Sequence, residues 1–136
     1  VEETHPLLKP LVTISNKEFK ERFGQMAGSW RGKKPLQRNA IIALANYRDK
    51  TAVPLLLRVM KEDMRPVMKG TAAWAVAEIV NESNQEMIDY FNEQKAAATK
   101  KLESLENPSK EDIELIEELD KAIVVLQEKY REEATK

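Results

Sequence analysis

The chain has 136 residues, of which 42% are hydrophobic and 33% charged, with a formal net charge of −1. This is enough for one domain with its own core, and the absence of cysteine excludes disulfide frameworks and thiolate metal sites. No apolar run approaches the ~20 residues that a membrane-spanning helix needs, so we expect a cytoplasmic protein with no membrane partner.

Residues 1–14 are expected to form an extended connector, because Pro6 and Pro10 disfavour a helix there. The segment is acidic and has neither a starting Met nor a signal-peptide pattern, so we expect it to follow a longer upstream region. His5 is the single histidine of the chain. Its position in this connector predicts a solvated side chain rather than a catalytic base or metal ligand.

Four helices are predicted between residues 15 and 81. Ser15 and Glu18 have the spacing of a capping box, so the first helix should begin there and end near Gly24. The second should cover residues 35–47. The third should cover residues 51–61 with Asp49 as its cap, and the fourth residues 67–80 after Pro66.

An offset of 32 residues relates the second of these helices to the fourth. Five positions match at this offset, namely Leu36 with Met68, Ala40 with Ala72, Ala43 with Ala75, Leu44 with Val76 and Tyr47 with Ile79. Such self-similarity is typical of stacked helical repeats. Trp74 lies among the alanines of the fourth helix, where we expect it in the core.

Residues 82–136 predict two long helices separated by Asn107-Pro108. Capping-box spacings at Ser83 and Ser109 mark the two starts. Apolar residues recur every three or four positions in both helices, and no β-alternation occurs anywhere, so we expect an all-α chain that ends in an antiparallel hairpin packed as a terminal repeat. The second helix of the hairpin has its stripe at Ile113, Ile116, Leu119, Ile123, Leu126 and Tyr130, and a solvated acidic face at Glu114, Glu117 and Glu118.

The charge is unevenly distributed along the chain. Residues 1–80 hold 14 basic and 8 acidic side chains, whereas residues 81–136 hold 8 and 15. This asymmetry indicates that the first half meets a polyanion, or else that each half has an ordinary solvated surface. No glycine-rich phosphate loop, H-E-x-x-H pattern or metal-ligand spacing is present, so we expect no catalysis and no metal site in these residues.

Basic residues mark the starts of the two repeat helices, where partial positive charge already favours an anion. Stacked repeats place equivalent positions on one edge, so these cations predict a ridge that binds the phosphates of a nucleic acid. Trp30 beside the ridge is a candidate for stacking on an unpaired base. The alternatives are a packing role for Trp30, and a solvent face or an acidic partner for the ridge. The ridge consists of Arg31, Lys33, Lys34, Arg38, Arg65 and Lys69.

Two stretches carry a resemblance to a known family. The sequence FGQMAGSWRGKKPLQRNAIIALAN, followed by DKTAVPLLLRVMKEDMRPVMKGTAAWAVAEI, resembles the C-terminal HEAT-like region of bacterial epoxyqueuosine reductases, especially those of Firmicutes. The close match covers roughly residues 16–79, and the match of the final hairpin is loose. The resemblance divides the chain into a connector (1–14), HEAT-like repeats (15–81) and a long acidic hairpin (82–136).

The resemblance implies a parent enzyme that reduces epoxyqueuosine to queuosine in tRNA with a cobalamin and two 4Fe-4S clusters. It implies that those cofactors and the catalytic residues lie upstream of this segment. The implied partners are the tRNA anticodon stem–loop and the catalytic and ferredoxin-like domains of the same chain. Two alternatives stay open, a scaffold that binds proteins and a free-standing HEAT protein from another pathway.

Overall fold

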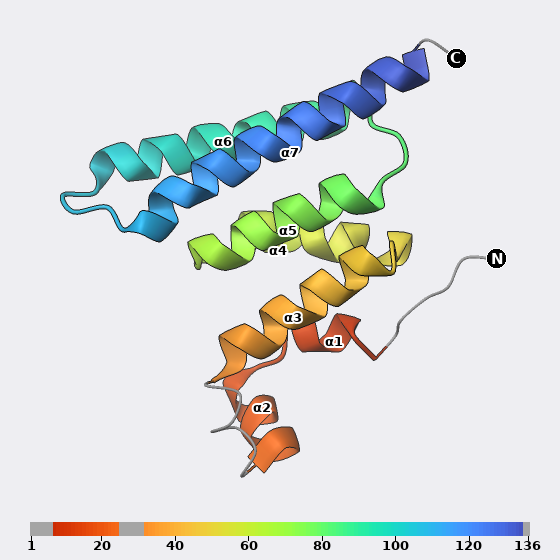
Figure 1. Ribbon diagram of the computed structural model, residues 1–136. Helices are drawn as coiled ribbons and strands as arrows, with labels where there is room; N and C mark the ends of the chain where they lie inside the picture. Colours follow the sequence, from red (N-terminus) through yellow and green to blue (C-terminus); the bar gives the residue numbers. More distant parts are fainter. Residues whose placement is uncertain (1–6, 25–31, 135–136) are drawn as a thin grey trace.

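The computed structural model describes residues 7–24 and 32–134, and within these ranges all secondary structure is helical. The all-α prediction is therefore confirmed (Figure 1). His5, Trp30 and Arg31 lie outside the described residues. The elements in chain order are α1 (Lys9–Val12), α2 (Asn16–Phe23), α3 (Lys33–Asn46), the short 3₁₀ helix η2 (Lys50–Ala52), α4 (Val53–Glu62), α5 (Pro66–Ile79), α6 (Gln85–Ser104) and α7 (Lys110–Ala134).

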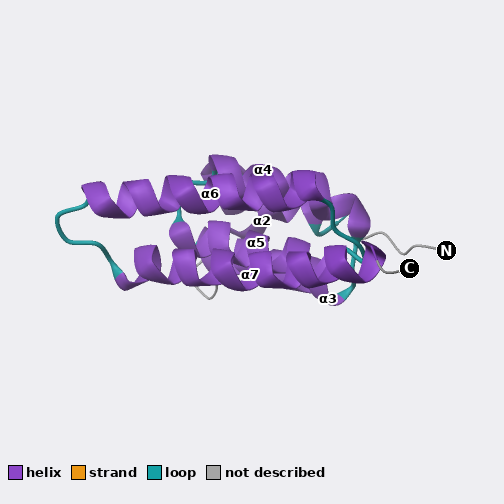
Figure 2. Cartoon of the chain, turned by 90° about the horizontal axis from the view of Figure 1, so that it is seen from above, coloured by secondary structure: helices purple, strands orange, loops and turns teal. Residues whose placement is uncertain are grey.

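The helices stack in two layers. α3, α5 and α7 lie side by side and run in the same general direction, while α4 and α6 run the opposite way in a second layer against α5 and α7 (Figures 1 and 2). α4 and α5 form one antiparallel pair, and α6 and α7 form the predicted longer hairpin. No described helix is both long and apolar enough to cross a membrane.

α5 is the central helix of the stack. It packs against α3, α4 and α7, and therefore has neighbours around most of its circumference. Four alanines of this helix are buried, which lets the surrounding helices approach closely. A helix enclosed in this way is apolar on nearly all sides, as the sequence of α5 is. The buried alanines are Ala72, Ala73, Ala75 and Ala77.

The 32-residue offset matches buried positions of α3 and α5. Leu36 and Met68 are both buried, as are Ala40 with Ala72 and Leu44 with Val76. The match fails at the helix ends, because Ile79 is buried whereas Tyr47 is 55% exposed. Tyr47 follows the last residue of α3, where the neighbouring helices no longer cover it.

Capping determines where several helices begin. The Ser15 hydroxyl accepts a hydrogen bond from the Glu18 amide, and Ser109 and Asp112 cap each other reciprocally, as predicted. The prediction for Ser83 was wrong, because the Asn84 side chain accepts the Met87 amide instead at 2.8 Å. Ser83 is buried, and its hydroxyl has no partner among the described residues.

The N-terminal segment is not wholly extended as expected. Residues 9–12 form α1, because Pro10 occupies its first turn, where a backbone N–H is not needed. Val12 and Ile14 are buried and hold this segment against the rest of the fold.

More residues than predicted are buried in the middle of α7, whereas the two ends of its predicted apolar stripe are exposed. Leu119, Ile123 and Leu126 are buried as expected, together with Leu115 and Ala122. The additional burial arises because α7 packs on both α5 and α6. The two predicted ends of the stripe, Ile113 and Tyr130, are exposed, since the hairpin extends beyond the shorter α4–α5 pair (Figure 1).

Candidate nucleic-acid interface

Three of the predicted cations lie in the first two turns of α3. Lys33 and Lys34 begin the helix and Arg38 follows one turn later. Gly32 precedes them with φ 99°, a left-handed conformation that favours glycine, and it provides no side-chain acceptor for the first amides. The first turn contains no acidic residue, so lysines stand where the helix dipole disfavours cations. Such a placement costs stability unless an anion binds there.

None of these three cations makes an ion pair with another described residue. Lys34 and Arg38 are exposed and Lys33 is half-buried. The start of α3 is therefore an uncompensated cationic surface within the described part of the chain.

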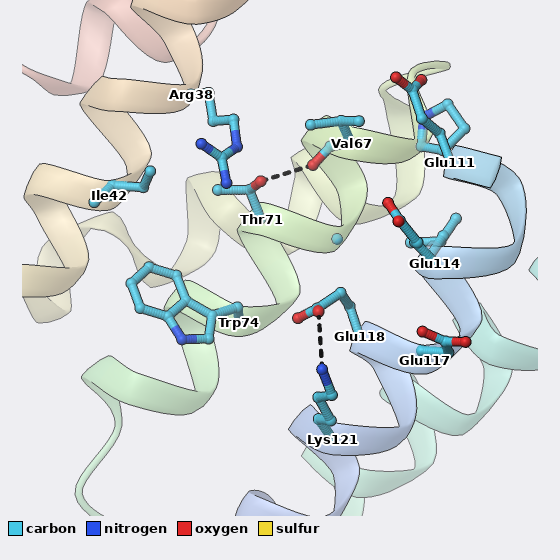
Figure 3. A pocket seen from close by; sticks show the side chains of 13 residues that line it. Arg38, Ile42, Val67, Thr71, Trp74, Glu111, Glu114, Glu117, Glu118 and Lys121 are labelled. Carbon is cyan, nitrogen blue, oxygen red and sulfur yellow. Dashed lines mark hydrogen bonds and ion pairs between the residues drawn. The ribbon is translucent and has the colours of Figure 1, made fainter.

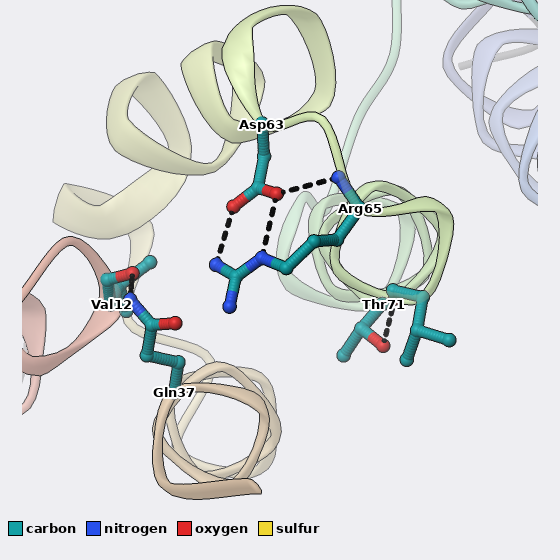
Figure 4. Close-up of polar contacts among 6 residues, drawn as sticks. Val12, Gln37, Asp63, Arg65 and Thr71 are labelled. Carbon is teal, nitrogen blue, oxygen red and sulfur yellow. Dashed lines mark hydrogen bonds and ion pairs between the residues drawn. The ribbon is translucent and has the colours of Figure 1, made fainter. Parts of the chain in front are cut away.

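Arg65, the counterpart of Lys33 in the second repeat, is held by Asp63. Its Nε and Nη2 donate to the two carboxylate oxygens at 3.0 and 2.8 Å, and its backbone amide donates at 2.9 Å (Figure 4). Partial burial raises the pKa of Asp63, but the hydrogen bonds and charge of Arg65 outweigh it, so the pKa lies below its usual value. Arg65 and Lys33 line one shared cavity of about 300 Å³, which keeps Arg65 near the cationic surface although its charge is paired.

Lys69 has a structural role that the charge pattern did not reveal. Its ammonium donates to the carbonyls of Met60 and Lys61, at 3.0 and 3.3 Å, where α4 ends. Partial burial, and then the charge of Lys101, lowers the pKa of Lys69. Gln37, which lies 32 residues earlier, likewise donates to the carbonyl of Val12, the last residue of α1, at 2.8 Å. Equivalent repeat positions thus donate to the end of an earlier helix, α1 for Gln37 and α4 for Lys69. Lys69 faces a cavity shared with α6 and α7 rather than the start of α3.

A groove of about 550 Å³ lies between α3, α5 and α7. Arg38 lines it from α3, Trp74 from α5, and Glu114, Glu117 and Glu118 from α7 (Figure 3). Trp74 is half-buried: it packs against the main core cluster and also lines this groove, so its prediction as a core residue holds only in part. The three glutamates were predicted to form a solvated face. Glu114 and Glu118 are instead half-buried in the groove wall.

The described residues contain no group of three or more His, Cys, Asp or Glu side chains that could hold a metal ion. The 4Fe-4S clusters implied by the family resemblance do not fit this chain, because such clusters are bound by cysteine thiolates and the sequence has none. The arrangement of cations at the start of α3 is instead suited to binding an anion.

Comparison with known proteins finds several epoxyqueuosine reductases among the proteins similar to this chain. The epoxyqueuosine reductase of Bacillus cereus is 60% identical over 84 residues, which is 62% of this chain and 22% of that protein. The epoxyqueuosine reductase of Bacillus subtilis is 53% identical over 98 residues, 72% of this chain and 25% of that protein. The chain thus spans about a quarter of the length of these relatives. No family model matches it.

The fold is shared with solved structures of the same enzymes. One is an epoxyqueuosine reductase bound to an epoxyqueuosine-modified tRNA stem loop, with 42% sequence identity and a TM-score of 0.69. The match covers 88% of this chain and 28% of that one. Because nearly the whole chain is covered, the likeness includes more than the residues that carry the sequence resemblance.

Proposed function

We propose, from the homology of this chain to a segment of Firmicute epoxyqueuosine reductases, that it forms the C-terminal helical domain of such an enzyme and holds the tRNA anticodon stem–loop. The observation that supports RNA contact is the cationic start of α3, which has no ionic partner among the described residues, in a fold shared with an enzyme solved with a tRNA stem loop. The domain would comprise a connector (1–14), HEAT-like repeats (15–81) and the terminal hairpin (82–136).

In this proposal the whole enzyme reduces epoxyqueuosine to queuosine, and this segment contributes binding rather than chemistry. The two 4Fe-4S clusters would be held outside it, since no cysteine is available here, and the family resemblance implies that cobalamin is bound upstream as well. The segment's own residues would position the stem loop by contacts to phosphates, which fix register but carry no sequence information.

The phosphate contacts are assigned to Lys33, Lys34 and Arg38, with Arg31 beside them in sequence. Arg65 contributes less, because Asp63 already neutralises it, and Lys69 is committed to the end of α4. Each phosphate neutralised should add about 0.7 to 0.9 to the slope of log affinity against log salt.

Charge reversal at the start of α3 tests the proposal. In the full-length enzyme, Lys33→Glu combined with Lys34→Glu should weaken binding of the tRNA stem loop and flatten its salt dependence by about 1 to 2 units of slope. Fluorescence anisotropy at several salt concentrations measures both quantities, and circular dichroism checks that helicity is unchanged.

Lys100→Glu is the matched control, since Lys100 is an exposed lysine of α6 that lies outside the cationic surface. It should leave RNA affinity and the salt slope as they are. Unaltered affinity in the Lys33/Lys34 variant would reject RNA binding by this surface.

A second candidate function is a scaffold that docks a protein or an upstream domain. The acidic α7 wall of the groove favours it, because carboxylates repel a phosphate backbone. On this alternative the Lys33/Lys34 variant would bind RNA normally, while the catalytic domain would become more accessible to limited proteolysis.

A further inference from the structure

The groove between α3, α5 and α7 has features that phosphate binding at the start of α3 does not use. Its volume of about 550 Å³ is within the range of small-molecule sites, about 300–1,000 Å³. Its chemistry also changes from one wall to the other, with Arg38 on α3, an aromatic ring on α5, and on α7 several carboxylates together with Lys121, which is paired with Glu118 (Figure 3).

Trp74 contributes an aromatic ring to the apolar surface of the groove, which Ile42, Val67 and Leu115 also line. The residues on either side of it in the sequence, Ala73 and Ala75, are completely buried, whereas the indole is left half-exposed. A partly exposed tryptophan that shares the groove with Arg38 suits a planar base, because base stacking tolerates any π-face. Trp74 therefore offers the stacking surface that the sequence had suggested for Trp30.

Glu118 is fixed close to this surface by the contact between α5 and α7. Gly70 lies one turn before Trp74, and a Cβ at Gly70 would lie 3.6 Å from the Cβ of Glu118. The two helices therefore approach closely there, and the Glu118 carboxylate enters the groove beside Trp74. Its partner within the described chain is Lys121 on the same helix, at 3.4 Å, which leaves most of the acceptor sites of the carboxylate available.

The charges of the groove define an orientation for a ligand. Arg38 on α3 has no ionic partner among the described residues and attracts a phosphate, whereas Lys121 on α7 is already paired with Glu118. Glu114 and Glu118 on α7 repel a phosphate and accept hydrogen bonds from N–H donors. A nucleotide satisfies both walls if its phosphate faces α3 and the edge of its base faces α7. Guanine fits best, because its N1–H and N2–H₂ are adjacent donors that one carboxylate can accept together. Adenine and cytosine place a ring acceptor beside their amino group.

We propose that this groove binds one unpaired guanine nucleotide of an RNA, with the base stacked on Trp74, its N1–H and N2–H₂ donated to Glu118, and its phosphate on Arg38. The proposal rests on RNA binding at the start of α3 and adds a base-reading site to it. The same chemistry also admits a free guanine mononucleotide, and the experiment below separates the two sources.

Tryptophan fluorescence gives a direct measurement. The chain has two tryptophans, so Trp30→Phe leaves Trp74 as the only reporter. In this background, a short RNA hairpin with one unpaired loop guanosine should quench the emission and bind about tenfold more tightly than the same hairpin with inosine, which lacks the N2 amine. GMP should quench only at much higher concentration, and equal affinity for GMP and hairpin would instead assign the site to free nucleotides.

Variants separate stacking from edge recognition. Trp74→Leu should weaken hairpin binding by about fivefold or more, and Trp74→Phe, which retains an aromatic face, should restore most of it. Glu118→Gln should abolish the preference for guanosine over inosine, because the amide replaces one acceptor with a donor. Glu128→Gln, an exposed residue of α7 that does not line the groove, should retain the preference.

The outcomes distinguish the two proposals. Equal binding of guanosine and inosine hairpins, with no effect of Glu118→Gln, would overturn the base-reading site while the Lys33/Lys34 variant could still confirm phosphate binding. If Trp74→Leu loses helicity, Trp74→Phe and Glu118→Gln decide the question on their own. Absence of hairpin binding to this chain, with stem-loop binding by the full-length enzyme still weakened by the Lys33/Lys34 variant, would overturn the base-reading site alone.

Discussion

Two lysines of the predicted cationic ridge have different surroundings in this chain. Lys33 has no ionic partner among the described residues, whereas Lys69 donates to two carbonyls where α4 ends. Gln37, the repeat counterpart of Lys69, makes the same type of bond to α1 with a neutral side chain. The shared requirement at this position is thus a donor to the end of an earlier helix, and the charge of Lys69 is incidental to it.

Replacing Lys69 with methionine tests this assignment. Lys69→Met retains the length of the side chain but leaves the Met60 and Lys61 carbonyls without these bonds, so the free energy of unfolding should fall by about 1 kcal/mol. Urea denaturation measures the change. RNA affinity should stay the same, and a loss as large as that of the Lys33/Lys34 variant would return Lys69 to the binding surface.

At the scale of helices, capping groups decide where α6 begins. The carboxamide of Asn84 accepts the Met87 amide, while the hydroxyl of Ser83 is buried without a partner in the described chain. A spacing of three residues to an acidic side chain is common to true and false capping boxes. Whether Ser83 or Asn84 caps α6 depends on the path of the chain from α5 into α6. The local sequence pattern does not specify that path.

Alanine at these two positions should have opposite consequences. Asn84→Ala removes the cap of α6 and should lower the free energy of unfolding by about 1 kcal/mol. Ser83→Ala removes a buried hydroxyl that has no partner, and should be neutral or slightly stabilising. Thermal unfolding monitored by circular dichroism compares them, and a larger loss for Ser83→Ala would show that the serine caps the helix after all.

Over the whole molecule, the helix starts could be predicted from the sequence, but the groove formed jointly by several helices could not. Pro66 and the Ser109–Asp112 pair mark the starts of α5 and α7 through interactions between residues close in sequence. The sequence alone was therefore enough to predict these two helix starts. The exposure of Trp74 depends on α3 and α7 leaving a groove over α5, and the position of Glu118 depends on Gly70, 48 residues away in sequence. The cluster of cations at the start of α3 could be predicted because its residues lie within one short stretch of sequence.

The hairpin is a structural part of the repeat stack rather than a separable appendage. α7 covers α5, whose Ala72, Ala75 and Val76 are fully buried, and Lys129 of α7 donates to the carbonyls of Ala77 and Val80 where α5 ends. In stacked repeats each unit is stabilised by its neighbours, so removing the last unit exposes the apolar face of the one before it.

A chain ending at residue 81 should therefore lose its cooperative fold, and not only the helices that were removed. We expect the truncated chain to bind a hydrophobic dye such as ANS and to unfold without a cooperative transition, because one side of α5 becomes exposed to water. The complete chain should unfold in a single urea transition at which fluorescence and circular dichroism coincide. Lys129→Met in the complete chain provides an intermediate case, with a lower midpoint but retained cooperativity, since it removes one link between α7 and α5 and leaves the apolar contact. Cooperative unfolding of the truncated chain, equal to that of the 136-residue chain, would contradict this expectation. The helices before residue 81 would then be an independent unit that does not need α7.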